Sequence, residues 1–343
     1  MTYLNSDQAK ALPAKSQPDL SSLPFLKYCP RYWGTHAKRE TSDSTILLAL
    51  ELLDQYENHV AANALFEQIL NPEDIREVNA PPLFSGLHCA SFFGIVDVMT
   101  GLLRRGGCDP NRGDSAGVTP LTWAARGGHE EAVELLLGLE AVRPNKPDNN
   151  GSTPLWWAAN KGHSLVTKQL LDKEDVSPDQ PDNRSITPLL LAAFLGHESV
   201  AKQILDREDV HPDQPSFKDC TPLLMAAARG HESVVRQLLD HKKVDPNKPS
   251  NMGQTPLCLA AIQGHESVVK QLLDRKEVVP DKPENEGMTP LSWAATRGHE
   301  SVVKQLLDRE NVNPGQPDNR GMTPFSLAAG KGHQAIMNLL SGR

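Results

Sequence analysis

The sequence has few of the features that mark a secreted, disulfide-bonded or membrane-spanning protein. Its 343 residues include only five cysteines, an odd number with no Cys-x-x-Cys pair. A disulfide framework is therefore not expected, and a reducing compartment, the cytoplasm or the nucleus, fits better. No apolar run approaches the ~18 residues that a membrane span needs. Residues 1–7 lack the basic and apolar regions of a signal peptide.

Signals of nucleic-acid binding and of catalysis are also missing. The formal net charge is −8, which disfavours general binding to phosphate backbones. No Gly-x-x-x-x-Gly-Lys-Ser/Thr loop occurs, so no nucleotide site is expected. The acidic residues are spread along the chain, and no pair is singled out for acid–base work. We therefore expect neither an enzyme nor a bound cofactor or metal ion.

What the sequence does have is a repeat with a period of 34 residues. A Thr-Pro pair opens each copy, an Ala-Ala pair follows, then Gly-His, and then a run rich in valine and leucine. The threonines that open the seven copies are Thr119, Thr153, Thr187, Thr221, Thr255, Thr289 and Thr323. A period of this size indicates stacked supersecondary units.

Each copy predicts two short helices and a projecting turn. In the copy at residues 252–285, Thr255 is placed to cap a helix, and the proline after it favours the first helical position. Gly264 suits the left-handed conformation that often ends a helix. The second helix is expected to begin near Glu266, where a carboxylate favours the helix dipole, and to stop at Asp274.

The motifs Gly-x-Thr-Pro-Leu, Ala-Ala-x-x-Gly-His and a closing Leu-Leu resemble those of ankyrin repeats over residues 82–343. The resemblance implies an all-α repeat solenoid of about eight helix–turn–helix repeats with projecting turns or short hairpins. The usual ankyrin period is 33, so each copy here has one extra residue. The histidine that the family carries after Thr-Pro-Leu is replaced by Thr122, Trp156, Leu190, Leu224, Cys258, Ser292 and Ser326.

The chain is expected to have three parts. Residues 1–40 are interpreted as a flexible tail with an aromatic junction segment, and residues 41–81 as a helical cap on the array. The repeats are placed near residues 82–115, 116–149, 150–183, 184–217, 218–251, 252–285, 286–319 and 320–343. In the first repeat Ser85-Gly86 replaces Thr-Pro, which predicts a weaker helix start. Residues 24–38 resemble the junction before the ankyrin array of fungal NACHT–ankyrin (NOD-like receptor) proteins, although no NACHT domain is present.

Two residue types recur at fixed places in the repeat. One histidine per copy follows the glycine, and repeats about 10 Å apart hold such groups too far apart to share a metal ion. A structural role is therefore expected, in which each histidine hydrogen-bonds the loop between its two helices. Trp123, Trp157 and Trp293 share one repeat position with leucines, and we predict that all three belong to the core.

Comparison among the copies separates scaffold from candidate surface. The second helix is almost invariant, whereas the turn tip and the two residues after Ala-Ala vary. In ankyrin proteins these positions line the concave face and contact partners. Here they are polar in the flanking repeats and apolar in the middle ones, and large apolar groups rimmed by polar ones mark interaction sites. The predicted partner-binding residues are Ile186, Phe194, Leu195, Phe217, Met252 and Ile262.

Two functions remain open at this point. The first is a protein-recognition module, a monomeric array that serves a NOD-like receptor system. The alternative is a regulatory scaffold, such as a nuclear ankyrin coregulator of a fungal gene cluster. In both cases the partner is another protein, with no direct contact to nucleic acid or membrane.

Overall fold

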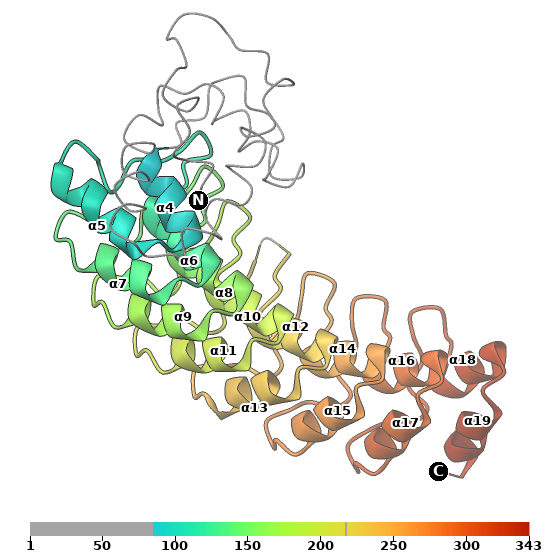
Figure 1. Ribbon diagram of the computed structural model, residues 1–343. Coiled ribbons are helices and arrows are strands. Elements are labelled where there is room, and N and C mark those ends of the chain that lie inside the picture. Colours follow the sequence, from blue (N-terminus) through green and yellow to red (C-terminus); the bar gives the residue numbers. More distant parts are fainter. Residues whose placement is uncertain (1–84, 217, 343) are drawn as a thin grey trace, which may run out of the picture. The chain divides into compact units, whose positions relative to one another are not determined.

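The computed structural model describes residues 85–216 and 218–342. The expected tail and helical cap therefore lie outside the described residues. The chain divides into two compact units, Met1–Val176 and Ser177–Arg343. Within the described residues of each unit the regular structure is helical throughout, with no strand (Figure 1). The expected hairpins are turns.

In both units the helices come in pairs, and in the copy at residues 252–285 they have the predicted bounds. The first unit contains α4 Gly86–Phe93, α5 Val96–Arg105, α6 Pro120–Gly127, α7 Glu130–Leu137, α8 Pro154–Lys161 and α9 Ser164–Leu171. The second unit contains α10 Pro188–Leu195, α11 Glu198–Leu205, α12 Pro222–Arg229, α13 Glu232–Asp240, α14 Pro256–Gln263, α15 Glu266–Leu273, α16 Pro290–Arg297, α17 Glu300–Leu307, α18 Pro324–Lys331 and α19 Gln334–Ser341. The all-α repeat solenoid is thus confirmed.

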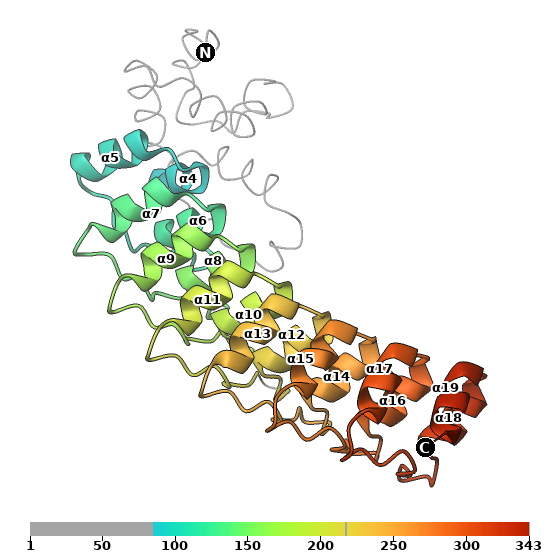
Figure 2. The same ribbon diagram turned by 90° about the horizontal axis from the view of Figure 1, so that it is seen from below.

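Within each unit, first helices pack on first helices and second helices on second helices. In the second unit one row consists of the first helices α10, α12, α14, α16 and α18. The other row consists of the second helices α11, α13, α15, α17 and α19 (Figures 1 and 2). The alanine pair is fully buried in α6, α8, α10, α12, α14 and α16, whereas in α18 only Ala328 is buried. In α11, α13, α15 and α17 the valine, isoleucine and leucine residues are buried as well. Small alanines let the first helices approach closely, so each repeat buries its apolar stripe against its neighbours.

Every Thr-Pro pair starts a helix in the predicted way. In α14 the Thr255 hydroxyl accepts a hydrogen bond from the backbone N–H of Cys258 at 3.1 Å, which satisfies a donor that the helix itself cannot. The first repeat, which lacks Thr-Pro, reaches the same result differently. The Ser85 N–H donates to His88 Nδ1 at 3.0 Å, and His88 Nε2 donates to the Arg112 carbonyl at 2.9 Å. The predicted weakness of this start is therefore offset by a buried histidine.

His88 occupies the position at which the other repeats have lost the ankyrin histidine. Burial lowers its pKa to about 4, because a charged imidazole is costly away from water. The neutral ring suits the observed bonds, since Nδ1 can accept only while it is unprotonated. In three later repeats a hydroxyl at this position pairs directly with the capping threonine, as between Thr289 and Ser292 at 3.0 Å. Trp156, Leu190, Leu224 and Cys258 have no hydroxyl to offer in the other four.

The recurring Gly-His pair joins one repeat to the next. His265 Nε2 donates to the Ala228 carbonyl at 3.2 Å, across the boundary between two repeats. The expectation that each histidine bonds the loop of its own repeat is therefore wrong, because its partner lies in the preceding first helix. The same ring restricts which residue can occupy the position that it faces. Gly230 has φ +74°, and a Cβ there would lie 2.7 Å from His265 Nδ1, so glycine is needed for both space and conformation.

The projecting turns are held by acidic side chains and by asparagines. Asp148 Oδ1 accepts the N–H groups of Asn150 and Ser152, both at 2.9 Å, and its Oδ2 accepts from Trp157 Nε1 at 3.0 Å. Asn149 then ties this turn to the previous one, since its Nδ2 donates to the Ser115 carbonyl at 3.0 Å. Trp123 is buried as predicted, but Trp157 and Trp293 are only half-buried. Assigning both to the core was wrong, because the ring of Trp157 extends out to the turn.

The loops after the second helices carry a second ladder of side chains. Asn247 Oδ1 accepts the Val279 N–H at 2.8 Å, and its Nδ2 donates to the Glu277 carbonyl at 2.7 Å. Asp213 holds the equivalent position in the preceding repeat, and its Oδ2 accepts the Asp245 N–H at 2.7 Å. Its Oδ1 is buried without a partner, because a carboxylate has no donor for the equivalent carbonyl. Asp281 shows the same pattern.

Candidate functional site

In the second unit the exposed positions of the first helices form a row of their own. Each first helix ends with the two residues after Ala-Ala, and these lie in its last turn, before the C-cap glycine. Because the helices stack in register, these residues lie side by side along the unit. We call them the first-helix row: residues 194–195, 228–229, 262–263, 296–297 and 330–331.

Three predicted partner-binding residues belong to the first-helix row. Phe194 and Ile262 are half-buried, whereas Leu195 is exposed to 38%. The backbone carbonyls of Phe194 and Ile262 accept the histidine bonds from the following repeats, at 3.0 and 3.1 Å. Their backbones are thus fixed by the scaffold, while their side chains reach the surface.

The other predicted residues lie on the turns. Met252 is the most exposed of the set, at 57%, and its carbonyl accepts the Asn285 N–H at 3.1 Å. Ile186 is half-buried just before the helix cap, with its N–H bonded to Asp182 Oδ1 at 2.8 Å. Phe217 lies outside the described residues. The structure thus holds an exposed methionine on a turn whose backbone is fixed by its neighbours.

Arginine side chains lie against the aromatic residues of the first helices. In the second unit the Arg229 guanidinium lies 4.1 Å from the centroid of the Phe194 ring, within the range of a cation–π contact. In the first unit Arg126 contacts two rings, at 4.4 Å from Trp157 and 5.2 Å from Trp123. Planar cations therefore line first helices in both units, which the choice of apolar residues alone did not reveal.

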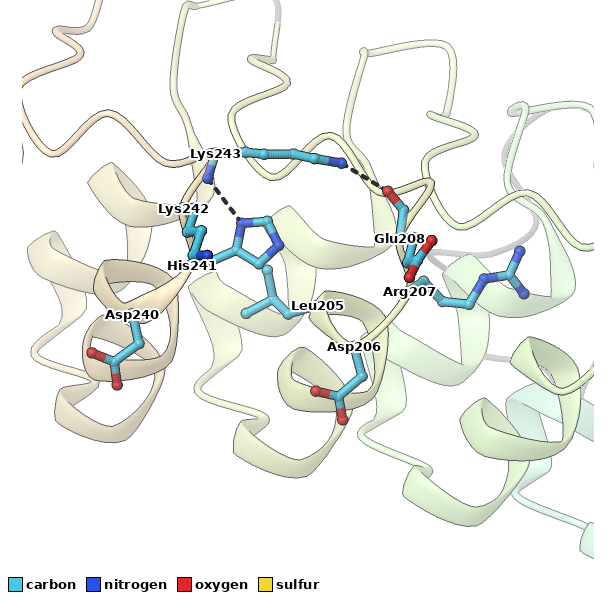
Figure 3. A pocket seen from close by; sticks show the side chains of 8 residues that line it. All are labelled: Leu205, Asp206, Arg207, Glu208, Asp240, His241, Lys242 and Lys243. Atoms are coloured by element: carbon cyan, nitrogen blue, oxygen red, sulfur yellow. Dashed lines mark hydrogen bonds between the residues drawn. The ribbon is translucent and has the colours of Figure 1, made fainter.

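A shallow hollow of about 530 Å³ opens at the other edge of the second unit, where α11 and α13 end (Figure 3). Its lining residues are Leu205, Asp206, Arg207, Glu208, Asp240, His241, Lys242 and Lys243. Most of the charged groups already have partners. Arg207 pairs with Asp209 at 2.9 Å, Asp206 pairs with Lys202, and Lys243 Nζ donates to the Glu208 carbonyl at 2.7 Å.

The hollow has a local cause in the sequence. In the next two repeats an arginine at the equivalent position bonds the preceding second-helix end, Arg275 to Asp240 and Arg309 to Asp274. His241 is shorter, and its Nδ1 accepts the Lys243 N–H at 3.3 Å instead. The hollow is therefore a gap left by a shorter side chain and carries no arrangement of reactive groups.

The described residues offer no arrangement that could hold a metal ion. No group of three or more His, Cys, Asp or Glu side chains comes together within residues 85–216 and 218–342. Burial raises the pKa of the Cys89 and Cys258 thiols to about 12, so both remain protonated, and the thiolate is the reactive form. Within the same residues no helix is both long and apolar enough to cross a membrane.

Stacked helix pairs with a 34-residue period and fixed turns define a helical repeat solenoid. The model of the family described as ankyrin repeats (3 copies) matches residues 58–148, 139–214, 189–282 and 276–343. The chain belongs to the ankyrin repeat family, whose repeats act as protein–protein interaction modules and are typically non-enzymatic scaffolds. A search of curated proteins found no match.

Residues of the first-helix row that the sequence prediction passed over are Arg229 and Arg297. Both lie at the position of Leu195, one and three repeats further on. Aligning the copies at this position gives Leu195, Arg229, Gln263, Arg297 and Lys331, so the sequence did hold the signal. It was missed because apolar residues alone were sought.

Proposed function

We propose that the chain binds a partner protein through the first-helix row and turns of its second unit. The observation that carries the proposal is the exposure of Leu195 and Met252, 38% and 57%, on backbone that the scaffold holds fixed. When a partner covers apolar groups on a fixed backbone, no loop has to be ordered, which lowers the entropic cost of binding. Phe194, Ile262 and Ile186 would extend the same surface.

The test is a pair of variants matched in exposure and chemistry. Leu195→Ser with Met252→Ser removes the exposed apolar groups of the proposed surface. Val279→Ser removes a comparably exposed group, 48%, from the loop after a second helix. Peptides selected on the intact chain from a random display library serve as probes, and their affinity is measured by fluorescence anisotropy.

The proposal predicts that the double variant binds the selected peptides at least about tenfold more weakly, since interface anchors dominate binding energy. Val279→Ser should bind as the original chain does, and circular dichroism should show all three proteins folded. Equal binding by the folded double variant, or a loss confined to Val279→Ser, would refute the proposed surface.

For the cellular role we propose the recognition part of a NOD-like receptor system, with a nuclear coregulator as the alternative. The support for the first is the resemblance of residues 24–38 to the junction of fungal NACHT–ankyrin proteins. An upstream reading frame that encodes a phosphate-binding Gly-Lys-Ser/Thr loop would support the receptor role. Accumulation of the intact chain in the nucleus would support the coregulator instead.

A further inference from the structure

The charges on the first helices all have one sign. The described first helices are α4, α6, α8, α10, α12, α14, α16 and α18. They contain five charged residues and no acidic one, although the whole chain carries a net charge of −8. These residues are Arg126, Lys161, Arg229, Arg297 and Lys331. The second helices differ, because α11, α13, α15 and α17 each begin with a glutamate and carry a lysine or arginine four residues later. The excess of acid therefore lies elsewhere, and the first-helix row is basic.

The three cations of the second unit are exposed and lack a carboxylate partner among the described residues. Arg229, Arg297 and Lys331 are exposed, and none forms an ion pair within residues 85–216 and 218–342. Some other cations of the unit do form ion pairs. Lys202 binds Asp206 at 2.9 Å, and Arg320 lies 3.6 Å from Glu286 on a neighbouring turn. The first-helix row thus carries positive charge only, whereas each cation on α11, α13, α15 and α17 shares its helix with a glutamate.

The helix dipole accounts for only part of this pattern. A cation in the last turn of a helix is favoured by the partial negative charge there, which explains the sign at each position. Lys202 also lies in the last turn of its helix, however, and Asp206 follows it at hydrogen-bonding distance. Four residues after Arg229, Arg297 and Lys331 stand Ser233, Ser301 and Ala335, which carry no charge, so the surface charge remains available to a partner.

Apolar and basic residues alternate over α10, α12 and α14, and α16 and α18 each carry a cation. Phe194 and Leu195 lie on α10, Arg229 on α12 and Ile262 on α14. Arg297 lies on α16 and Lys331 on α18. Repeats stack about 10 Å apart, so α10 and α18 are separated by roughly 40 Å along the row. Arg229 lies against the Phe194 ring.

We propose that the partner segment is an acidic peptide that also carries apolar side chains. This inference rests on the proposed function and adds the chemistry of the partner. The apolar residues cover Phe194, Leu195, Met252 and Ile262, and carboxylates lie opposite Arg229, Arg297 and Lys331. Complementary charges of this kind fix register and speed association, and the arginine forks suit carboxylates.

Nucleic acid would also be attracted by a basic row, but it fits the observations less well. Three cations spread over four repeats neutralise few phosphates, and the affinity of proteins for nucleic acid grows with the number neutralised. The apolar residues of the row would gain little from a phosphate backbone. A peptide that combines carboxylates with apolar side chains satisfies both kinds of residue.

The experiment compares two triple charge reversals that change the net charge by the same amount. One carries Arg229→Glu, Arg297→Glu and Lys331→Glu on first helices. The control carries Arg236→Glu, Lys270→Glu and Lys304→Glu, which are exposed on second helices of the same unit. The full chain of each is used to select peptides from one random display library. A labelled single-stranded DNA is titrated in parallel.

The original chain and the control should select peptides rich in Asp, Glu and apolar residues, and the first-helix variant should not. An acidic peptide selected on the original chain should bind the first-helix variant at least about tenfold more weakly. Its affinity for the original chain should fall as the salt concentration is raised. Selected peptides with the same charge composition on both variants would overturn the proposal. The proposal would also be overturned if single-stranded DNA bound the original chain as tightly as the peptide does and bound the first-helix variant more weakly.

The outcomes also separate this inference from the proposed function. Suppose that neutral apolar peptides bind the original chain and bind the Leu195→Ser, Met252→Ser variant more weakly. The proposed binding surface would then stand, and the inference of an acidic partner would be refuted. Acidic peptides that lose affinity equally on both triple reversals would show an effect of net charge alone. That result would also overturn the inference. Circular dichroism confirms that each variant is folded before its binding is compared.

Discussion

His299 Nε2 lies 3.1 Å from the carbonyl oxygen of Ile262, so the second helix of one repeat is bonded to the first helix of the repeat before it. The bond uses a carbonyl near the helix end that has no partner inside its own helix. The same residue, Ile262, presents its side chain to the proposed binding surface. Ile262 therefore belongs both to the scaffold, through its carbonyl, and to the proposed surface, through its side chain. The bond from His299 fixes the backbone that carries this side chain.

His299→Ala should lower the free energy of unfolding by about 1–3 kcal/mol, because a half-buried carbonyl loses its donor. Urea titration followed by circular dichroism measures the change. His241→Ala is the control, since that ring bonds only its own loop, and its effect should stay within about 0.5 kcal/mol. Equal losses in the two variants would show that the bond between repeats adds nothing.

Thr255→Ala should lower the free energy of unfolding by roughly 0.5–2 kcal/mol, because the Cys258 N–H loses its cap. Glu266→Ala removes an exposed carboxylate from the first turn of α15 and should cost at most about 1 kcal/mol. Both are measured by urea titration under the same conditions. A larger cost for Glu266 than for Thr255 would contradict the capping role of the threonine.

Acidification should destabilise the first unit through His88. Its pKa is about 4 in the folded chain against an ordinary value of 6.5, so between these values the unfolded chain binds the proton and the folded one does not. Stability is thus present above pH 6.5 and falls as the pH drops through about 4, by up to about 3 kcal/mol.

The measurement is the pH dependence of urea unfolding for the original chain and for His88→Thr. The variant carries the residue that the next repeat has at this position, Thr122. Its stability should vary less between pH 6.5 and pH 4. The same slope in both proteins would show that His88 does not carry the effect.

Asp213→Asn and Asp281→Asn should each stabilise the second unit at neutral pH, by about 1 kcal/mol. The amide would donate where the buried Oδ1 has no partner, as Asn247 does in the repeat between them. Burial raises the pKa of both carboxyls above the ordinary 3.8. The stabilising protonated form is therefore present at low pH and is lost as the pH rises through the folded pKa.

The gain from these substitutions should accordingly shrink as the pH approaches 3.8. Glu277→Gln removes an exposed charge from the loop between Asn247 and Asp281 and should have little effect. The reverse exchange, Asn247→Asp, should destabilise. A gain from Glu277→Gln equal to that from Asp281→Asn would point to net charge instead of the missing donor.

The sequence was sufficient for the fold because each element repeats with its own start and stop signals. Thr255, Gly264 and Glu266 predicted the ends of α14 and the start of α15, and the structure confirms all three. What the sequence could not supply was contact between copies. The bond from His265 to the Ala228 carbonyl depends on how repeats stack, and a residue pattern alone gives no partner for the ring.

The candidate surface was predictable only in part for the same reason. Variation at the turn tips pointed to Met252, and the structure adds that its side chain is exposed while its backbone is fixed. Asn149 stands one position earlier on its turn, where Asn183, Asn251, Asn285 and Asn319 also stand, and its Nδ2 holds the neighbouring turn. Turn-tip positions can thus be structural, and hydrogen bonds separate them from positions open to a partner.

The most direct test of the proposed surface is site-specific photo-crosslinking with a peptide selected on the intact chain. A photoreactive phenylalanine analogue is placed at Leu195, at Met252 or, as a control of similar exposure, at Val279. The account predicts crosslinks from positions 195 and 252 that excess unlabelled peptide suppresses, and none above background from position 279. Crosslinks from position 279 alone, or with equal yield from all three, would contradict binding at the first-helix row.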